Sequence, residues 1–337
     1  MHLGIDCYSV RDQGWNAFQM MDFATRLQLD TVHFSERGYL ASFEADYLRQ
    51  VRTYAEERGL AIEVGMGSFD RYSASFKPEL GSGEVQLAAM IDVAVALGSR
   101  VVRCFLGTEA DRHGPVPLER HIDECIRTLR AISGKVQDTG VKIAVENHGG
   151  VDLLARELRA LVETVGFDTV GVCLDTGNPV YGGEDPLVSA EVLTPYVLTS
   201  HVRDSRVWMT PDGAQVQWVP LGDGNVDLAA IIALIEEHHP EAPIDLEIIT
   251  GRPPKNLNYQ HPLGTFWQIY PQMLARDFVR FLQLVGRGKD GPLQQVTVEW
   301  GHEINNEDRI AFQRQQVEHF EKSVRFAREQ LRLGRRR

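Results

Sequence analysis

The feature that most constrains this chain is a regular alternation of short β-rich runs and helix-length amphipathic stretches. Strand-like runs cover residues 3–8, 31–34, 61–65, 100–106, 141–145, 170–174, 197–200 and 244–246. Amphipathic stretches that predict helices cover residues 18–29, 45–58, 83–97, 118–139, 153–165, 186–193 and 228–238. Such alternation is typical of parallel β/α units, and eight units in about 250 residues match the size of a closed (β/α)₈ barrel, the TIM barrel.

The main alternative to the barrel is an open, doubly wound α/β sheet. A chain of 337 residues is long enough for one large barrel or for two smaller domains. A doubly wound nucleotide-binding fold would normally place a GxGxxG loop after its first strand, and the sequence has none there. We therefore predict an α/β fold of the (β/α)₈ TIM barrel class.

Two segments exceed a minimal barrel. Residues 206–227, which follow the seventh strand, contain Asp212-Gly213 between polar and apolar runs and predict a β-hairpin insert. Residues 252–337 form a C-terminal helical extension that ends in a helix predicted over about 306–331. Its aromatic residues favour packing against the barrel or a neighbouring subunit, so we expect a barrel domain over 1–251 and an extension over 252–337.

Composition and charge exclude several classes of function. With 43% hydrophobic and 24% charged residues, the chain has the composition of a globular protein, and no run approaches the roughly 20 apolar residues of a membrane span. A formal net charge of −12 disfavours nucleic acid as a partner. The N-terminus lacks a basic start and an apolar core, so we expect no signal peptide, no membrane association and a cytoplasmic location.

Polar residues that can bind a metal follow four neighbouring predicted strands. They are Glu146 after strand five, Asp175 after strand six, His201 after strand seven and Glu247 in strand eight. A single acidic residue at a strand end is usually solvated or salt-bridged, but barrel enzymes collect their working groups at the C-terminal ends of strands. Three carboxylates and one imidazole suit one divalent ion, with Mn²⁺ expected and Mg²⁺ or Co²⁺ as alternatives.

The segments VENHGG, CLDTGN, SHVRD and PLGDGNVD resemble the sugar phosphate isomerase/epimerase family, the xylose isomerase-like TIM barrels. The resemblance covers roughly residues 1–250 and is strongest from strand five onward. It implies that Glu146, Asp175, His201 and Glu247 bind one divalent ion. It also implies that Glu146 and Glu247 act as acid/base groups on a carbonyl–hydroxyl pair of a sugar.

Four further residues are candidates for the site. His148 lies two residues after Glu146 and should share its barrel-facing side, so it is either a catalytic acid/base residue or a structural hydrogen-bonding group. Arg203 either binds a substrate oxygen or pairs with Asp204. Asn178 stands where some epimerases of the family have His, and Glu36 closes strand two across the pocket; we expect both to contact substrate.

The chemistry that this site supports is removal of a proton next to a carbonyl, assisted by the metal. The first function is a sugar isomerase or epimerase. The second is a lyase, because residues 264–282 resemble the tail of the barrel α-subunit in bacterial C-glycoside deglycosidases. Those enzymes cleave 3-oxo-glycosides by elimination and pair with a small β-subunit, so we expect either a homo-oligomer or such a hetero-oligomer. A keto-sugar dehydratase and an abasic-site endonuclease are weaker alternatives, the latter because it needs several zinc ions and a basic groove.

Overall fold

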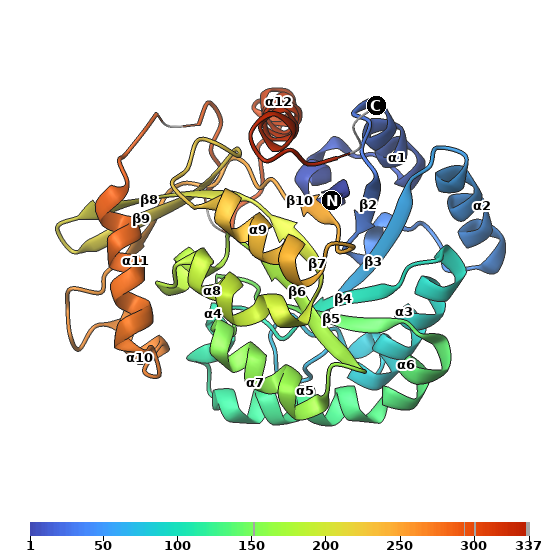
Figure 1. Cartoon of the computed structure of the whole chain (residues 1–337), viewed down its shortest axis with the longest axis horizontal. Coiled ribbons are helices and arrows are strands. Elements are labelled where there is room, and N and C mark those ends of the chain that lie inside the picture. The colour runs from blue at the N-terminus through green and yellow to red at the C-terminus, as the bar shows by residue number, and fades with distance from the viewer. Residues whose placement is uncertain (151, 293, 300, 335–337) are drawn as a thin grey trace.

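The computed structural model describes residues 1–334 except 151, 293 and 300, and it contains a closed barrel of eight parallel strands (Figure 1). The barrel strands are β1 (Leu3–Asp6), β2 (Thr31–Phe34), β3 (Ala61–Ser68), β4 (Val101–Phe105), β5 (Lys142–Glu146), β6 (Val170–Asp175), β7 (Val197–Val202) and β10 (Ile244–Leu246). Their order around the barrel is β1-β10-β7-β6-β5-β4-β3-β2. The predicted TIM barrel is confirmed, and the doubly wound alternative is excluded.

The barrel strands form where the sequence offers short, mostly apolar runs. Every residue of β1, β2, β4, β6 and β10 is buried, as expected for parallel strands covered by helices on one face and by the barrel interior on the other. The strand register determines which polar side chains share a layer inside the barrel. Asp6 pairs with His33, while His201 pairs with both Asp175 and Asp245.

Helices follow the strands and surround the barrel. They are α1 (Ala17–Arg26), α2 (Ala45–Glu56), α3 (Gly83–Leu97), α4 (Glu109–Arg112), α5 (Leu118–Ala131), α6 (Ser133–Thr139), α7 (Ala155–Val165), α8 (Pro186–Leu193) and α9 (Leu228–His238). Short 3₁₀ segments are η1 (Cys7–Gln13), η2 (Arg37–Tyr39), η3 (Pro78–Leu80), η4 (Pro179–Gly182) and η5 (Thr194–Tyr196). Within the described part of the chain, none of the helices combines the length and the apolar character needed to cross a membrane.

The prediction of one continuous helix over 118–139 was wrong. The helix breaks at Ile132, which separates α5 from α6. The Ser133 hydroxyl donates a hydrogen bond to the Arg130 carbonyl at 2.9 Å, and such local bonds compete with helix propagation.

The predicted hairpin after the seventh strand is present. Strands β8 (Asp204–Thr210) and β9 (Gly213–Val219) pair antiparallel, and β11 (Lys255–Leu257) adds a third strand beside β9. This small sheet stands apart from the barrel in Figure 1, next to α11. The hairpin and β11 therefore form one small sheet beside the barrel.

The chain after β11 contains α10 (Thr265–Ile269), α11 (Ala275–Arg287) and α12 (Arg309–Glu329). Helix α11 buries Phe281, Leu284 and Val285 against the hairpin sheet. Helix α12 returns to the barrel, where Phe320 is fully buried and its ring centroid lies 5.7 Å from that of Phe23. The last long helix thus contributes directly to the barrel core.

The position of Phe320 leads to a prediction about stability. Replacing Phe320 with Ala should lower the free energy of unfolding by about 3–5 kcal/mol, because it removes a fully buried aromatic side chain from the core. Urea unfolding followed by tryptophan fluorescence measures the change. Ile310→Ala on the same helix is the matched control, since Ile310 is 71% exposed and should change stability little. Equal effects of the two substitutions would show that α12 does not contribute to the barrel core.

Candidate metal centre and cavity

The four predicted ligands converge at one end of the barrel. Glu146 and Asp175 are the last residues of β5 and β6, His201 is the fifth residue of β7, and Glu247 directly follows β10. These four strands are consecutive neighbours in the barrel. One ligand atom from each residue lies within 4.8 Å of the others, and all four residues are buried.

The donor set fits a divalent cation. His201 Nδ1 and Glu247 Oε2 are buried and form no hydrogen bond of acceptable geometry among the described residues. Nδ1 lies 3.0 Å from Glu146 Oε2 and 3.5 Å from Glu247 Oε2. Carboxylate oxygens and an imidazole nitrogen are ligands that Mn²⁺, Mg²⁺ and Co²⁺ accept, so these residues could hold such an ion.

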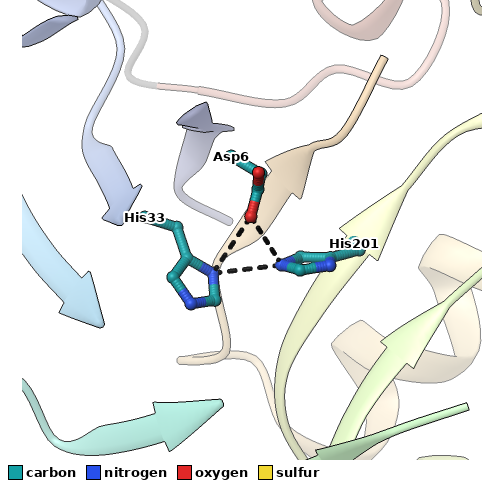
Figure 2. Close-up of side chains that lie close together, drawn as sticks. All are labelled: Asp6, His33 and His201. Carbon is teal, nitrogen blue, oxygen red and sulfur yellow. Dashed lines mark hydrogen bonds and ion pairs between the residues drawn. The ribbon is translucent and has the colours of Figure 1, made fainter. Parts of the chain in front are cut away.

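The other ring nitrogen of His201 faces Asp6 and His33, as Figure 2 shows. Nε2 lies 2.9 Å from Asp6 Oδ2 and 3.2 Å from His33 Nδ1. Burial by itself would raise the pKa of Asp6, but the charge of His201 and its hydrogen bond lower that pKa to about 2. The ionised Asp6 therefore lies in ion-pair contact with Nε2, while Nδ1 faces the proposed metal ligands. A carboxylate behind a metal-binding histidine is a common device for fixing its tautomer and ring orientation.

Proton and metal would compete for His201. Burial acts to lower the pKa of His201, but the acids around it, Glu146 and Asp6 among them, raise it well above its usual value. Burial and the charge of His201 lower the pKa of His33 to about 3, so His33 is neutral. In the absence of a cation, a proton on His201 compensates the carboxylates, and binding of a metal would release it.

A second polar layer lies closer to the N-terminal ends of the strands. Thr199 and Thr31 donate hydrogen bonds to the buried carboxyl groups of Glu63 and Asp245, respectively. Burial raises the pKa of Asp245 to about 7 and that of Glu63 well above its ordinary value. One carboxyl oxygen of each, Glu63 Oε2 and Asp245 Oδ2, lies 3.8 Å from His33 Nδ1. The barrel interior below the site is therefore polar.

Two arginines offset part of the negative charge. Arg103, on β4, donates from Nε to Glu146 Oε2 at 2.5 Å. Although burial would raise the pKa of Glu146, Arg103 and His201 hold it well below its ordinary value. Arg203 donates to Asp175 Oδ2 from Nε at 2.8 Å, and its Nη2 lies 2.6 Å from Glu247 Oε2.

These contacts leave a negative charge at the centre. The four carboxylates of Asp6, Glu146, Asp175 and Glu247 face the two guanidinium groups of Arg103 and Arg203, which leaves an excess of two negative charges when all are ionised. One divalent cation would cancel that excess of negative charge. Asp175 and Glu247 would then contact both the cation and the guanidinium group of Arg203.

Arg203 is held in place by a glycine and a tryptophan. A Cβ atom at Gly177 would lie 2.3 Å from Cγ of Arg203, so only glycine leaves room for this side chain. On another side, the Trp218 ring lies 4.6 Å from the guanidinium carbon, and Trp218 Nε1 donates to the Gly177 carbonyl at 3.0 Å. The considered pairing of Arg203 with Asp204 was wrong, because Asp204 instead accepts the backbone amides of Gly222 and Gly224, both at 3.0 Å.

A cavity of about 250 Å³ opens beside these groups. The predicted substrate residues Arg203, Asn178 and Glu36 line it, together with His148 and Glu247. Asn178 also donates to Glu146 Oε1 at 3.3 Å, and Glu36 lies 3.6 Å from Arg103. A larger hollow of about 530 Å³ beside α2, lined by surface residues, holds none of these groups.

His148 reaches the cavity from a loop and not from a strand. β5 ends at Glu146, and His148 stacks on Phe105 with ring centroids 3.6 Å apart. Its Nδ1 lies 2.9 Å from the Gly107 carbonyl oxygen. Burial lowers the pKa of His148 to about 4, so the ring is neutral at pH 7.

Sequence reasoning missed several members of this site: Asp6, His33, Glu63, Arg103, Asp245, Tyr8, Arg11, Trp218 and Arg252. A signal was present for some of them. An ionisable residue within an otherwise apolar barrel strand, such as Arg103 in VVRCF or His33 in TVHF, indicates a polar interior. Arg11 and Arg252 lie in irregular segments and carry no such signal.

Comparison with known proteins agrees with the barrel fold. Among solved structures, a D-psicose 3-epimerase from Clostridium cellulolyticum H10, solved with D-tagatose, superposes with a TM-score of 0.65 at 12% identity, covering 98% of this chain and 99% of that one. A xylose isomerase-like TIM barrel protein from Mycobacterium smegmatis, in complex with magnesium, has a TM-score of 0.57 at 18% identity and covers 84% of this chain and 96% of that one. At these identities, the likeness shows the fold alone.

A curated relative and a family model extend the comparison. The 3-oxo-isoapionate decarboxylase of Pectobacterium atrosepticum is 24% identical over 193 residues, and this alignment spans only 57% of each chain. The family model described as xylose isomerase-like TIM barrel matches residues 8–267. The chain belongs to the xylose isomerase-like TIM barrel family.

Proposed function

We propose that this chain is a divalent-metal-dependent enzyme that removes a proton from the carbon next to a carbonyl of a sugar or keto-sugar, as isomerases and epimerases do. The observation that carries the proposal is the convergence of four ligand atoms, from three carboxylates and one imidazole, beside a small cavity. A bound Mn²⁺, or Mg²⁺ or Co²⁺, would supply positive charge next to the carbonyl and hydroxyl oxygens of the substrate.

Glu247 is the residue best placed to take the proton. It lines the cavity and remains 5% exposed, whereas Glu146 is fully buried and is held by Arg103 and Asn178. Both were predicted as acid/base groups, and the geometry favours Glu247 for contact with substrate. Glu146 is better suited to binding the metal.

The second proton-transfer group is His148. It lines the same cavity as Glu247 but comes from the loop after β5, three strands away from β10. Its neutral imidazole can accept a proton from the carbon, and only the protonated ring can then return one. Return of the proton to the other face of the carbon would invert its configuration.

Arg203 would stabilise the negative charge that forms on the substrate oxygen. Its Nη1 atom is buried and has no hydrogen-bond partner among the described residues, while Nε and Nη2 contact Asp175 and Glu247. A fixed donor of this kind, in a buried site, stabilises negative charge as it develops in the transition state.

A second candidate is decarboxylation of a 3-oxo acid, which the curated relative favours. The bond between the carboxylate and its neighbouring carbon breaks, CO₂ leaves, and the electron pair passes to the carbonyl oxygen. The product is the same enolate, which is then protonated on carbon. One site could therefore serve either reaction, and the substrate decides between them.

Elimination from a 3-oxo-glycoside, as in a C-glycoside deglycosidase, also begins with an enolate. It rests on the resemblance of residues 264–282 and would involve a small β-subunit. A cavity of about 250 Å³ suits a single sugar ring, so an aglycone would have to extend beyond it. Co-purification with a small subunit and release of an aglycone would favour this reaction over the first two.

Deuterium exchange tests the proposal. The metal-loaded protein should incorporate ²H from D₂O into free ketoses, 3-keto-glycosides or 3-oxo sugar acids, and mass spectrometry measures the label. Glu247→Gln should slow this exchange by about 10²–10⁴-fold, since it removes the base. Glu57→Gln, an exposed change at the end of α2, is the control. Full exchange in Glu247→Gln would contradict the assignment of the base.

Metal affinity tests the role of Asp6. Asp6→Asn should weaken Mn²⁺ binding by roughly 10–100-fold, because the amide no longer fixes the His201 ring through Nε2. Calorimetric titration with Mn²⁺ measures the affinity, and circular dichroism checks that the variant is folded. The exposed Asp22→Asn should bind Mn²⁺ like the unchanged protein. An unaltered affinity in Asp6→Asn would show that His201 does not depend on this carboxylate.

A further inference from the structure

One backbone carbonyl determines which nitrogen of His148 is free to react. Nδ1 of His148 lies 2.9 Å from the carbonyl oxygen of Gly107, in the loop between β4 and α4. A carbonyl oxygen only accepts hydrogen bonds, so Nδ1 carries the proton of this contact. In a neutral imidazole the other nitrogen, Nε2, then keeps a free lone pair. The contact with Gly107 therefore leaves Nε2 as the atom that can take a proton.

The position of Gly107 is in turn fixed by the carboxylate of Asp152. Oδ2 of Asp152 accepts the backbone amide of Gly107 at 3.0 Å. Oδ1 accepts the backbone amides of His148 at 2.9 Å and of Leu153 at 2.7 Å. One carboxylate thus joins the loop between β4 and α4 to the loop between β5 and α7. Asp152 is fully buried and is not among the residues that line the cavity, so its effect on a substrate would pass through His148.

The two loops meet closely because Gly149 has no side chain. A Cβ atom at Gly149 would lie 2.8 Å from the Gly107 carbonyl oxygen and 2.9 Å from Cα of Thr108. Gly149 also has a φ of +63°, which glycine adopts without strain. Its carbonyl accepts the backbone amide of Glu109 at 2.9 Å. The carbonyl that faces the His148 ring therefore belongs to a closely packed pair of loops.

Other contacts hold the loop between β5 and α7 without using the Asp152 carboxylate. Arg112 Nη1 donates to the backbone carbonyl of Asp152 at 3.0 Å, and Arg112 is paired with Glu157. The Tyr270 hydroxyl, from the C-terminal extension, donates to the Gly150 carbonyl at 3.0 Å. We therefore expect this loop to stay folded when the carboxylate is altered, so that the role of the carboxylate can be measured separately.

We infer that His148 acts through Nε2 and that Asp152 is the positioning residue that holds the ring in this tautomer. This role rests on the proposed function, in which His148 is the second proton-transfer group. In the direction in which His148 removes the proton, Nε2 takes it from the carbon and the electron pair of the C–H bond passes to the carbonyl oxygen of the substrate. Nδ1 keeps its own proton and its bond to Gly107 throughout, and Nε2 returns the transferred proton in the reverse step.

The substitution Asp152→Asn breaks one contact of this arrangement. Because Oδ1 accepts two amides, the amide oxygen of Asn should take that place, and its NH₂ group would then face the amide of Gly107, donor against donor. Burial raises the pKa of Asp152 to about 7, while its three backbone amides act to lower it. Measurements at pH 8 therefore compare the variant with an ionised carboxylate.

Nuclear magnetic resonance of ¹⁵N-labelled histidine tests the tautomer in the Mg²⁺-loaded protein without any substrate. The signals of His148, identified by their loss in His148→Gln, should show a protonated Nδ1 and an unprotonated Nε2. In Asp152→Asn both nitrogens should shift toward the average of two exchanging tautomers. A proton on Nε2 in the unchanged protein, or an unchanged pattern in Asp152→Asn, would overturn the inference.

A buried carboxyl group elsewhere provides the matched control. Glu184 is 3% exposed and accepts the amide of Ala155 at 3.3 Å and the hydroxyl of Ser189 at 3.1 Å, but it belongs to the segment between η4 and α8. Glu184→Gln therefore removes a buried acid without touching the contact between Gly107 and His148. It should leave the His148 signals and the turnover unchanged. If it altered both as Asp152→Asn does, the effect of Asp152 would be a general structural one.

Kinetics test whether the position of the ring matters for the reaction. The probe is whichever ketose, 3-keto-glycoside or 3-oxo sugar acid exchanges ²H fastest with the unchanged protein. Asp152→Asn should slow product formation, which needs both proton-transfer groups, about tenfold or more, because a misplaced group loses its reacting geometry. The KM and the ²H exchange into recovered substrate, which Glu247 supports alone, should change little. Equal losses of exchange and of product formation would overturn the inference.

The two measurements separate this inference from the proposed function. A His148 tautomer that depends on Asp152, without ²H exchange in any probe, would support the positioning of the ring and contradict proton abstraction. Exchange and product formation that proceed in Asp152→Asn as in the unchanged protein would support proton abstraction and overturn the role of Asp152.

Discussion

Negative charge buried at one end of the barrel is the constraint on which the rest of this structure depends. Removing a carboxylate from water costs several kcal/mol unless it is paired, and four carboxylates meet here. Arg103 and Arg203 provide part of the compensation, and a proton on His201 offsets one of the two charges that remain. A centre balanced in this way is suited to exchanging that proton for a cation, so the same residues that form an ion-pair network could also hold a metal ion.

The segments outside the barrel contribute to this balance. The β8–β9 hairpin places Trp218 against Arg203. In the loop that follows the hairpin, the backbone amides of Gly222 and Gly224 donate hydrogen bonds to Asp204. Gly177 leaves the space through which the Arg203 side chain passes. An insertion that lies beside the barrel therefore positions a charge within it, and the hairpin is part of the site as much as the strand ends are.

Much of the fold, and the convergence of the four proposed ligands, could be predicted from the sequence because both depend on local, periodic signals. Apolar runs of strand length recur at regular spacing, and Glu146 and Asp175 close two of them. The remaining partners could not be predicted in this way. Asp6 and His33 contact His201 only because the barrel closes, and Arg11 and Arg252 line the same cavity only because β1 pairs with β10. The break at Ile132 depends on one hydroxyl, which no periodicity reveals.

The polar layer of His33, Glu63 and Asp245 has a consequence for thermal tolerance. Most barrels fill this interior with branched apolar side chains, and well-packed apolar groups often stabilise a core more than buried polar ones do. In this chain the polar layer replaces such apolar packing at the centre of the barrel, and His33 in that layer contacts His201 and supports its orientation. Replacing the polar side chains of this layer with apolar ones is therefore expected to raise the melting temperature. Those gains would come at the expense of the orientation of His201, so the same few positions would trade the melting temperature of this barrel against its proposed chemistry.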